Sequence, residues 1–286
     1  ASRGLGDVYK RQISYSPARV AKGDNSSNVV ERAIEYWNGD EGKRGIVTLC
    51  WHWCPAARYD KSKSDPWGTF YTDKTKFNLA RAMNGRDPDG YQMLLDDIDA
   101  IAVQLKRLQD ADVPVLWRPL HEASGGWFWW GASGADAYLQ LYKLMYDRLT
   151  NVHGLNNLIW VWNGQDAAWY PGDEYVDIIG EDIYPGKHVY TSQAARFIKA
   201  LSYTDTRKLI TLSENGCIPD PEQLVRDNIM WSYWCVWEGE FVLKAAGFNN
   251  YSEQYTEKNM LKKAYKSDTV ITRKELPDLR NYPLGD

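Results

Sequence analysis

The stretch Trp117-Arg-Pro-Leu-His-Glu-Ala-Ser-Gly-Gly-Trp127 joins the end of an apolar run to a turn that carries a carboxylate, Glu122. The run itself, residues 113–120, is rich in Val, Leu and Trp, which is typical of a buried β-strand. Glu214 has the same setting, because Leu212-Ser-Glu-Asn-Gly216 also ends a short apolar run. Catalytic groups at the carboxyl ends of strands are typical of the eight-stranded β/α barrel. These two stretches therefore favour an α/β protein with the architecture of a (β/α)8 TIM barrel.

Short β-branched and aromatic runs alternate with longer helical patterns along the rest of the chain. This order predicts a parallel sheet with helices outside it, and the sheet can be open or closed into a barrel. No glycine-rich phosphate loop follows any run, which argues against a dinucleotide-binding sheet. The predicted strands are Ile46–His52, Val113–Leu120, Leu158–Asn163, Val176–Ile183, Leu209–Ser213 and Trp231–Val236, and the predicted helices are Asn28–Trp37, Tyr91–Ala111, Ala135–Val152, Ser192–Tyr203 and Pro221–Asn228.

The N-terminal region leaves the predicted barrel one strand short. Ile13–Ser16 fits the end of a seventh strand, but Gly4–Gln12 has neither the alternation nor the apolar content of an eighth. We interpret residues 1–12 as foreign, library-derived sequence that replaces the true first strand, and residues 13–286 as a single barrel domain. A missing strand leaves two unpaired sheet edges. Either the foreign segment fills the slot, or a neighbouring chain covers it in an oligomer, or the barrel is imperfect.

Composition excludes several kinds of partner. The 34 Lys and Arg residues against 38 Asp and Glu give a net charge of −4, so no basic face is expected for nucleic acid or a membrane surface. No apolar run approaches the roughly 18 residues of a spanning helix. With 14 Trp and 19 Tyr against 6 Phe, the chain is rich in amphipathic rings that suit stacking on sugars.

Other catalytic chemistries fit the sequence poorly. A zinc site built on His121-Glu122 needs a second histidine four residues later, where Gly125 stands, and the chain has only 4 His. Neither Ser124 nor Ser213 lies in a Gly-x-Ser-x-Gly turn. We therefore expect no metal, no cofactor and no acyl transfer.

Four stretches together closely resemble glycoside hydrolase family 26, chiefly its β-mannanases. They are Arg118–Gly131, Tyr138–Trp162, Tyr175–Tyr184 and Leu212–Gly216, and the resemblance runs from about Tyr15 to the end of the chain. It implies a retaining catalytic domain that hydrolyses mannan, glucomannan or galactomannan by double displacement. It also implies a secreted bacterial enzyme of hemicellulose degradation, extracellular or periplasmic because its polymer lies outside the cell.

The resemblance assigns the catalytic roles. Glu122 is similar to the family acid/base and Glu214 to the nucleophile, two carboxyl groups that a retaining enzyme holds about 5 to 5.5 Å apart. Tyr184 matches the tyrosine that donates a hydrogen bond to the nucleophile. His121 stands where it would orient Glu122 or contact the sugar.

The resemblance also gives positions to the aromatic residues. His52 and Trp67 resemble a pair that binds the sugar at the reacting or adjacent subsite, and Trp127 matches a tryptophan near the cleavage point. Trp237 is expected beneath the cleaved sugar, with Trp234 a weaker candidate, and Trp162 on the leaving-group side. For the others we favour packing roles: Trp37, Trp51, Trp53, Trp129, Trp130, Trp160 and Trp231.

Two questions stay open at the level of sequence. The family also includes mixed-linkage β-1,3-1,4-glucanases and β-1,3-xylanases, and a barrel without its first strand could be an impaired carbohydrate-binding protein. Of the four cysteines, Cys217 and Cys235 lie near adjacent strand ends, so a disulfide between them is conceivable. Buried free thiols, at these two positions and at Cys50 and Cys54, are at least as compatible with the sequence.

Overall fold

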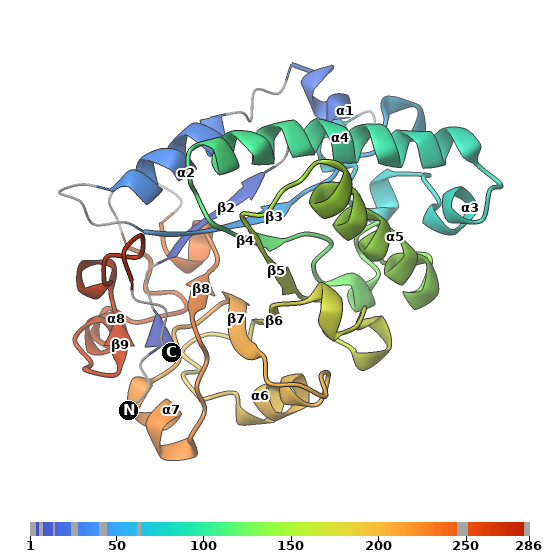
Figure 1. Ribbon diagram of the computed structural model, residues 1–286. Helices are drawn as coiled ribbons and strands as arrows, with labels where there is room; N and C mark the ends of the chain where they lie inside the picture. The colour runs from blue at the N-terminus through green and yellow to red at the C-terminus, as the bar shows by residue number, and fades with distance from the viewer. Residues whose placement is uncertain are drawn as a thin grey trace. The chain divides into compact units, whose positions relative to one another are not determined.

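The computed structural model describes residues 4–5, 8–13, 15–23, 28–39, 45–61, 64–244 and 251–282 (Figure 1). The chain divides into two compact units. The amino-terminal unit comprises Lys10–Trp37 and Val47–Asp177, and the carboxy-terminal unit comprises Ala1–Tyr9, Asn38–Ile46 and Ile178–Asp286. Among the described residues, no helix has the length and apolar character needed to cross a membrane.

The strands of the amino-terminal unit lie in their chain order. They are β2 (Val8–Ile13), β3 (Ile46–Trp51), β4 (Val115–Arg118) and β5 (Leu158–Trp162). β3, β4 and β5 run parallel, with Val47 paired to Val115 and Val115 to Leu158. Because the strands are parallel, their carboxyl ends lie at one edge of the sheet, which is where the sequence places Glu122.

Helices of the same unit cover the sheet with apolar faces. The longest, α4 (Pro88–Asp110), begins at Asp87, whose carboxylate accepts a hydrogen bond from the Gly90 amide at 2.9 Å. Its buried leucines and isoleucines recur at helical spacing, so one stripe of the helix packs inward. The other helices of this unit are α1 (Pro17–Val20), α2 (Asn28–Asn38), α3 (Leu79–Met83) and α5 (Ala135–Asp147).

The carboxy-terminal unit holds three further strands in the order β6, β7, β8. They are β6 (Ile178–Ile183), β7 (Leu209–Asn215) and β8 (Trp234–Val236), all parallel. Two short strands, β1 (Gly4–Leu5) and β9 (Val270–Ile271), pair separately. The helices are α6 (Ala194–Leu201), α7 (Pro221–Asp227) and α8 (Lys258–Tyr265).

Most predicted elements are present with shifts of a few residues at their ends. The predicted helix Ala135–Val152 changes from α5 to a π-helical turn at Arg148, and Tyr91–Ala111 begins three residues earlier. Gly4–Gln12 supplies strand residues although its sequence lacks a strand pattern: β1 covers Gly4–Leu5 and β2 covers Val8–Ile13, while residues 1–3 and 6–7 lie outside the described part of the chain. Among the described residues, β2 to β8 are seven parallel-sheet strands, one fewer than a complete barrel, as predicted.

Candidate active site

Glu214 lies near the end of β7 and is 3% exposed. The phenolic oxygen of Tyr184, just after β6, donates a hydrogen bond to Glu214 Oε2 at 2.6 Å. A hydrogen bond to the charged form of a carboxylate stabilises that form and fixes its orientation. The predicted pairing of Tyr184 with Glu214 is thus present in the geometry of this unit.

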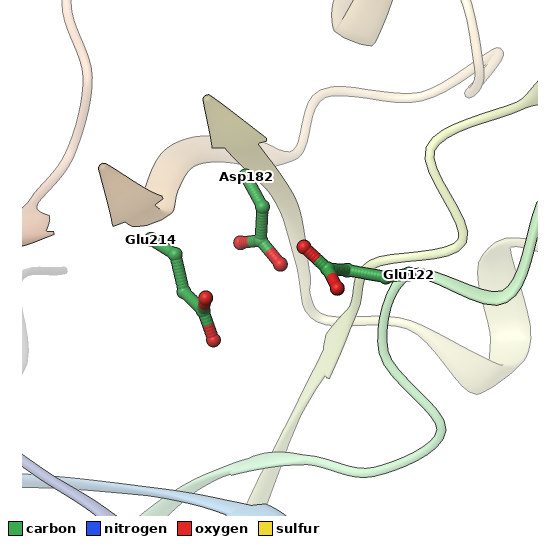
Figure 2. A group of neighbouring side chains, drawn as sticks. All are labelled: Glu122, Asp182 and Glu214. Carbon is green, nitrogen blue, oxygen red and sulfur yellow. The ribbon is translucent and has the colours of Figure 1, made fainter. Parts of the chain in front are cut away.

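Asp182 is a second buried carboxylate beside Glu214, and sequence reasoning missed it as a site residue. The β6–β7 register shifts after Glu181, so that Asp182 pairs with Glu214 and Ser213 is the extra residue. Ser213 Oγ donates to Asp182 Oδ1 at 2.9 Å. Figure 2 shows Asp182 and Glu214 at the ends of β6 and β7, with Glu122 on the segment that follows β4. The available signal was the polar and aromatic stretch from Asp182 to Tyr184 at the end of the predicted strand Val176–Ile183.

One side of the Tyr184 ring is packed against another aromatic ring, although the residue is 43% exposed. It packs against Phe241 with ring centres 5.4 Å apart. A Cβ atom at Gly216 would lie 3.2 Å from the Phe241 ring and 3.3 Å from the Tyr184 ring. Glycine at 216 therefore leaves room for both rings beside the end of β7.

Trp237 directly follows β8 and is partly exposed. Its amide donates to the Asn215 carbonyl at 3.0 Å, which ties the residue to the end of β7. Trp234 is only 3% exposed. Trp237 is thus more exposed than Trp234.

In the amino-terminal unit, Glu122 follows β4 in a left-handed backbone conformation, with φ 53° and ψ 31°. Its amide donates to the Asn163 carbonyl at 2.7 Å, and Arg118 donates to the Asn163 side chain at 2.5 Å. Leu120 also has φ 53°, so two residues with side chains take a conformation that favours glycine. The end of β5 thus holds a strained turn that presents the acid/base candidate.

Trp127 is a side chain of the same unit that contacts this carboxylate. Its indole N–H donates to Glu122 Oε2 at 2.9 Å. The residue is 47% exposed, so part of the ring remains open to solvent. Sequence reasoning placed Trp127 near the cleavage point without this hydrogen bond.

His52 and His121 lie edge to face, with ring centres 5.1 Å apart. They follow neighbouring strands, β3 and β4, and are 5% and 1% exposed. Trp67, in the short 3-10 turn Pro66–Gly68, is 38% exposed, and the Arg19 guanidinium lies 5.5 Å from its ring centre. The structure brings the two histidines together and leaves Trp67 accessible to a ligand.

Trp162 is fully buried. Its indole N–H donates to the Trp169 carbonyl at 3.1 Å, and its ring packs edge to face with Tyr170. This environment favours a packing role over contact with the sugar. The tryptophans expected to pack are buried as well: Trp37, Trp51, Trp53, Trp129, Trp130, Trp160 and Trp231.

All four cysteines are buried free thiols. Cys217 Sγ donates to the carbonyl oxygens of Gly186 and Tyr255 at 3.0 and 3.1 Å. Burial raises the pKa of Cys217 and of Cys54, which keeps both thiols protonated. Of the two alternatives left open, the structure has the thiols.

Each unit carries a glutamate at or after the carboxyl end of a parallel strand, Glu122 in the amino-terminal unit and Glu214 in the carboxy-terminal unit, and this pattern is typical of a glycoside hydrolase of the β/α-barrel class. Comparison with known families makes this more specific. The chain belongs to glycosyl hydrolase family 26, whose model matches residues 7–275.

The curated relatives include several mannan endo-1,4-β-mannosidases. A mannan endo-1,4-β-mannosidase of Thermothelomyces thermophilus is 44% identical over 265 residues, covering 92% of this chain and 52% of the relative. Mannan endo-1,4-β-mannosidase A of Piromyces sp is 38% identical over 250 residues, covering 87% of this chain and 38% of the relative. The chain thus spans about half or less of the length of these relatives.

Solved structures support the fold. A GH26-CBM35 β-(1,4)-mannanase of Podospora anserina superposes with a TM-score of 0.84 at 36% identity, over 96% of this chain and 63% of that one. A β-mannanase from a symbiotic protist of the termite Reticulitermes speratus, complexed with a gluco-manno-oligosaccharide, gives 0.77 at 34% identity, over 94% and 80%. The predicted fold class and the family resemblance are confirmed.

Proposed function

We propose that this chain is a retaining endo-β-1,4-mannanase acting on mannan, glucomannan or galactomannan. The observation that carries the proposal is the 2.6 Å hydrogen bond from Tyr184 to Glu214, at the end of β7 in a family 26 chain. A nucleophilic carboxylate must stay ionised and aimed at the anomeric carbon, and a phenol that donates to one of its oxygens serves both needs. The relatives named as mannan endo-1,4-β-mannosidases support β-mannan as the substrate.

The reaction would run in two displacements. Glu214 attacks the anomeric carbon while the protonated Glu122 gives its proton to the departing glycosidic oxygen, so that a covalent glycosyl-enzyme forms. Glu122, now a carboxylate, takes a proton from water, whose oxygen attacks the same carbon and releases Glu214. The product keeps the configuration of the substrate.

The sugar contacts follow from accessibility. Trp67 and Trp127 expose ring surface in the amino-terminal unit, and Trp237 does so beside β7. Indole faces suit the C–H faces of pyranose rings. We assign the buried His52 and His121 to holding the end of β4 and to hydrogen bonds with the sugar at the reacting subsite.

The test measures reducing-sugar release from linear β-1,4-mannan, galactomannan and mixed-linkage β-glucan in parallel, with Glu214→Ala as the blank. Hydrolysis of the mannans alone, lost in the variant, is the expected result. Hydrolysis of the glucan would support the β-1,3-1,4-glucanase alternative, and β-1,3-xylan serves as a fourth substrate. If a protein that melts cooperatively releases no reducing sugar from any substrate, the proposal is overturned. An impaired carbohydrate-binding barrel would then be favoured.

Several wider expectations rest on the same proposal. Residues 13–286 act as a single catalytic domain, and the family match from 7 to 275 runs through both compact units. The partners are β-mannan polysaccharide or manno-oligosaccharides, met outside the cell or in the periplasm. A bacterial source stays a prediction, since the relatives reported above include a fungus. The oligomer predicted from an open sheet edge is tested by light scattering.

A further inference from the structure

The indole N–H of Trp127 is hydrogen-bonded to one particular oxygen of the Glu122 carboxyl group. The N–H donates to Oε2 at 2.9 Å, a normal hydrogen-bond length. An indole nitrogen has only a donor to offer, because its lone pair belongs to the aromatic system. Oε2 must therefore act as an acceptor toward Trp127 in both protonation states of the carboxyl group.

Gly125 makes this contact possible. The indole folds back over the backbone of residue 125, and a Cβ atom there would lie 2.0 Å from Cζ3 and 2.1 Å from Cη2 of Trp127. Real Cβ atoms do not approach other atoms so closely, so any side chain at 125 must push the ring away. A glycine is thus required at position 125 because the indole leaves no room for a Cβ atom. The backbone conformation does not require it, since the φ of Gly125 is not positive.

The backbone around Trp127 is fixed independently of its ring. The Thr72 amide donates to the Trp127 carbonyl at 2.8 Å, and Thr72 Oγ1 donates to the Gly126 carbonyl at 2.8 Å. Two hydrogen bonds from one residue clamp the peptide on both sides of the Trp127 amide. The ring can therefore be displaced while the loop stays in place.

The next two indoles of the same stretch anchor the loop elsewhere. Trp129 Nε1 donates to the Trp53 carbonyl at 2.6 Å, and Trp130 Nε1 donates to the His121 carbonyl at 2.8 Å. Both rings are buried, whereas Trp127 is 47% exposed. Of these three tryptophans, only Trp127 directs its N–H to a carboxylate.

We propose that Trp127 is a positioning residue that keeps the acid proton of Glu122 on Oε1, and that Gly125 permits this arrangement. The inference rests on the function proposed above. In the first displacement the proton leaves Oε1 for the glycosidic oxygen. The hydrogen bond from the Trp127 N–H to Oε2 persists and stabilises the new carboxylate. In the second, Oε1 receives a proton from water, and Trp127 neither gains nor loses one.

The first test replaces the donor but keeps a ring. Trp127→Phe should lower kcat/KM on mannohexaose by about tenfold, part of what an oriented general acid contributes. It should lower kcat/KM on 2,4-dinitrophenyl β-mannobioside by less than about twofold, since that leaving group departs without a proton. The alkaline limb of the pH profile for mannohexaose should move to higher pH, because the carboxylate form of Glu122 loses a donor.

The second test displaces the ring without removing it. Gly125→Ala should reproduce the selective loss on mannohexaose in the natural chain and add nothing in a Trp127→Ala background, where the ring that it would strike is absent. Ser124→Ala, on the same exposed turn, is the matched control and should leave both substrates unaffected. Thermal melts of each variant report whether the fold is kept.

The outcomes separate this inference from the function on which it rests. A natural chain that hydrolyses no mannan overturns the proposed function. If it does hydrolyse mannan, equal losses on the two substrates in Trp127→Phe would reduce Trp127 to a substrate or structural contact and overturn this inference alone. Additive effects of Gly125→Ala and Trp127→Ala would show that Gly125 acts on something other than the indole.

Discussion

At the scale of single residues, the unusual backbone of the site is as informative as its side chains. Glu122 and Leu120 both have φ 53°, flanking a buried histidine. A non-glycine residue in this region costs on the order of 1 kcal/mol and persists only where its surroundings hold it. The hydrogen bond from the Glu122 amide to the Asn163 carbonyl supplies part of that hold.

Tyr184 gives a direct prediction for the nucleophile. Tyr184→Phe removes the hydroxyl that donates to Glu214 Oε2 and keeps the ring that packs on Phe241. We expect kcat on mannan to fall by roughly tenfold or more, because the carboxylate loses both orientation and charge stabilisation. The measurement is steady-state hydrolysis with a thermal melt to confirm the fold.

Tyr282→Phe is the matched control, because this ring is 59% exposed. Its rate should equal that of the natural chain. If Tyr184→Phe kept full activity, Glu214 would need another group to hold it, and the assignment of Tyr184 would fail.

Asp97 predicts a pH dependence of stability. This α4 carboxyl is 3% exposed and accepts the Trp53 indole N–H at 2.6 Å; burial raises its pKa from 3.8 to about 7. Between these values the folded chain holds a proton that the unfolded chain has released, so the free energy of unfolding falls as pH rises from about 4 to 7. This difference between the two pKa values of Asp97 corresponds to a change of at most about 4 kcal/mol in the free energy of unfolding.

Asp97→Asn tests this by removing the ionisation while keeping an acceptor for Trp53. The stability of the variant relative to the natural chain should rise from pH 4 to about 7 and then level off, as measured by urea unfolding at each pH. Val103→Ala, at an exposed position of the same helix without an ionisable group, should show no such trend. Parallel pH curves for Asp97→Asn and the natural chain would contradict the prediction.

At the scale of elements, the β6–β7 pair combines a shift in register with a buried charge. Glu181 is wholly buried and accepts hydrogen bonds from Arg196 of α6, whose side chain is 39% exposed. Burial raises the pKa of Glu181, while Arg196 opposes that rise. The ion pair therefore fixes α6 against the strand that also carries Asp182.

Arg196→Ala should destabilise the fold by about 2 kcal/mol, less than for a fully buried pair because water reaches Arg196. The measurement is the free energy of unfolding in urea. Glu181→Gln combined with Arg196→Met should recover much of the loss, since no unpaired charge then remains inside. A double variant as unstable as Arg196→Ala would show that the loss comes from packing rather than from charge.

Strands were predicted correctly where their side chains are apolar and buried. The prediction failed where a strand forms because of its pairing with a neighbouring strand. The apolar runs of β3 to β7 are buried on both faces, so their sequences predict strands from composition. β2, with the sequence Val-Tyr-Lys-Arg-Gln-Ile, lacks that pattern. Its strand conformation comes from its place beside β3, and backbone hydrogen bonds of that kind leave no mark on side-chain composition.

At the scale of the whole molecule, net charge predicts how salt affects activity. The chain carries −4 and the proposed polymer is neutral, so no long-range attraction exists for salt to screen. KM for β-mannan should change by less than about twofold between about 0.05 and 0.5 M NaCl. A KM that rises steeply with salt would indicate an anionic substrate and contradict the mannan proposal.

The sequence by itself determined the fold class, the family and the two glutamates at strand ends, because apolar periodicity and local motifs are properties of contiguous residues. Only the tertiary structure decided the rest. It showed Asp182 beside Glu214, the burial of Trp162, the N–H of Trp127 on Glu122 and the free thiols. Each of these depends on which side chains meet after the strands are paired in register, and one residue of register change sends a side chain to the other face.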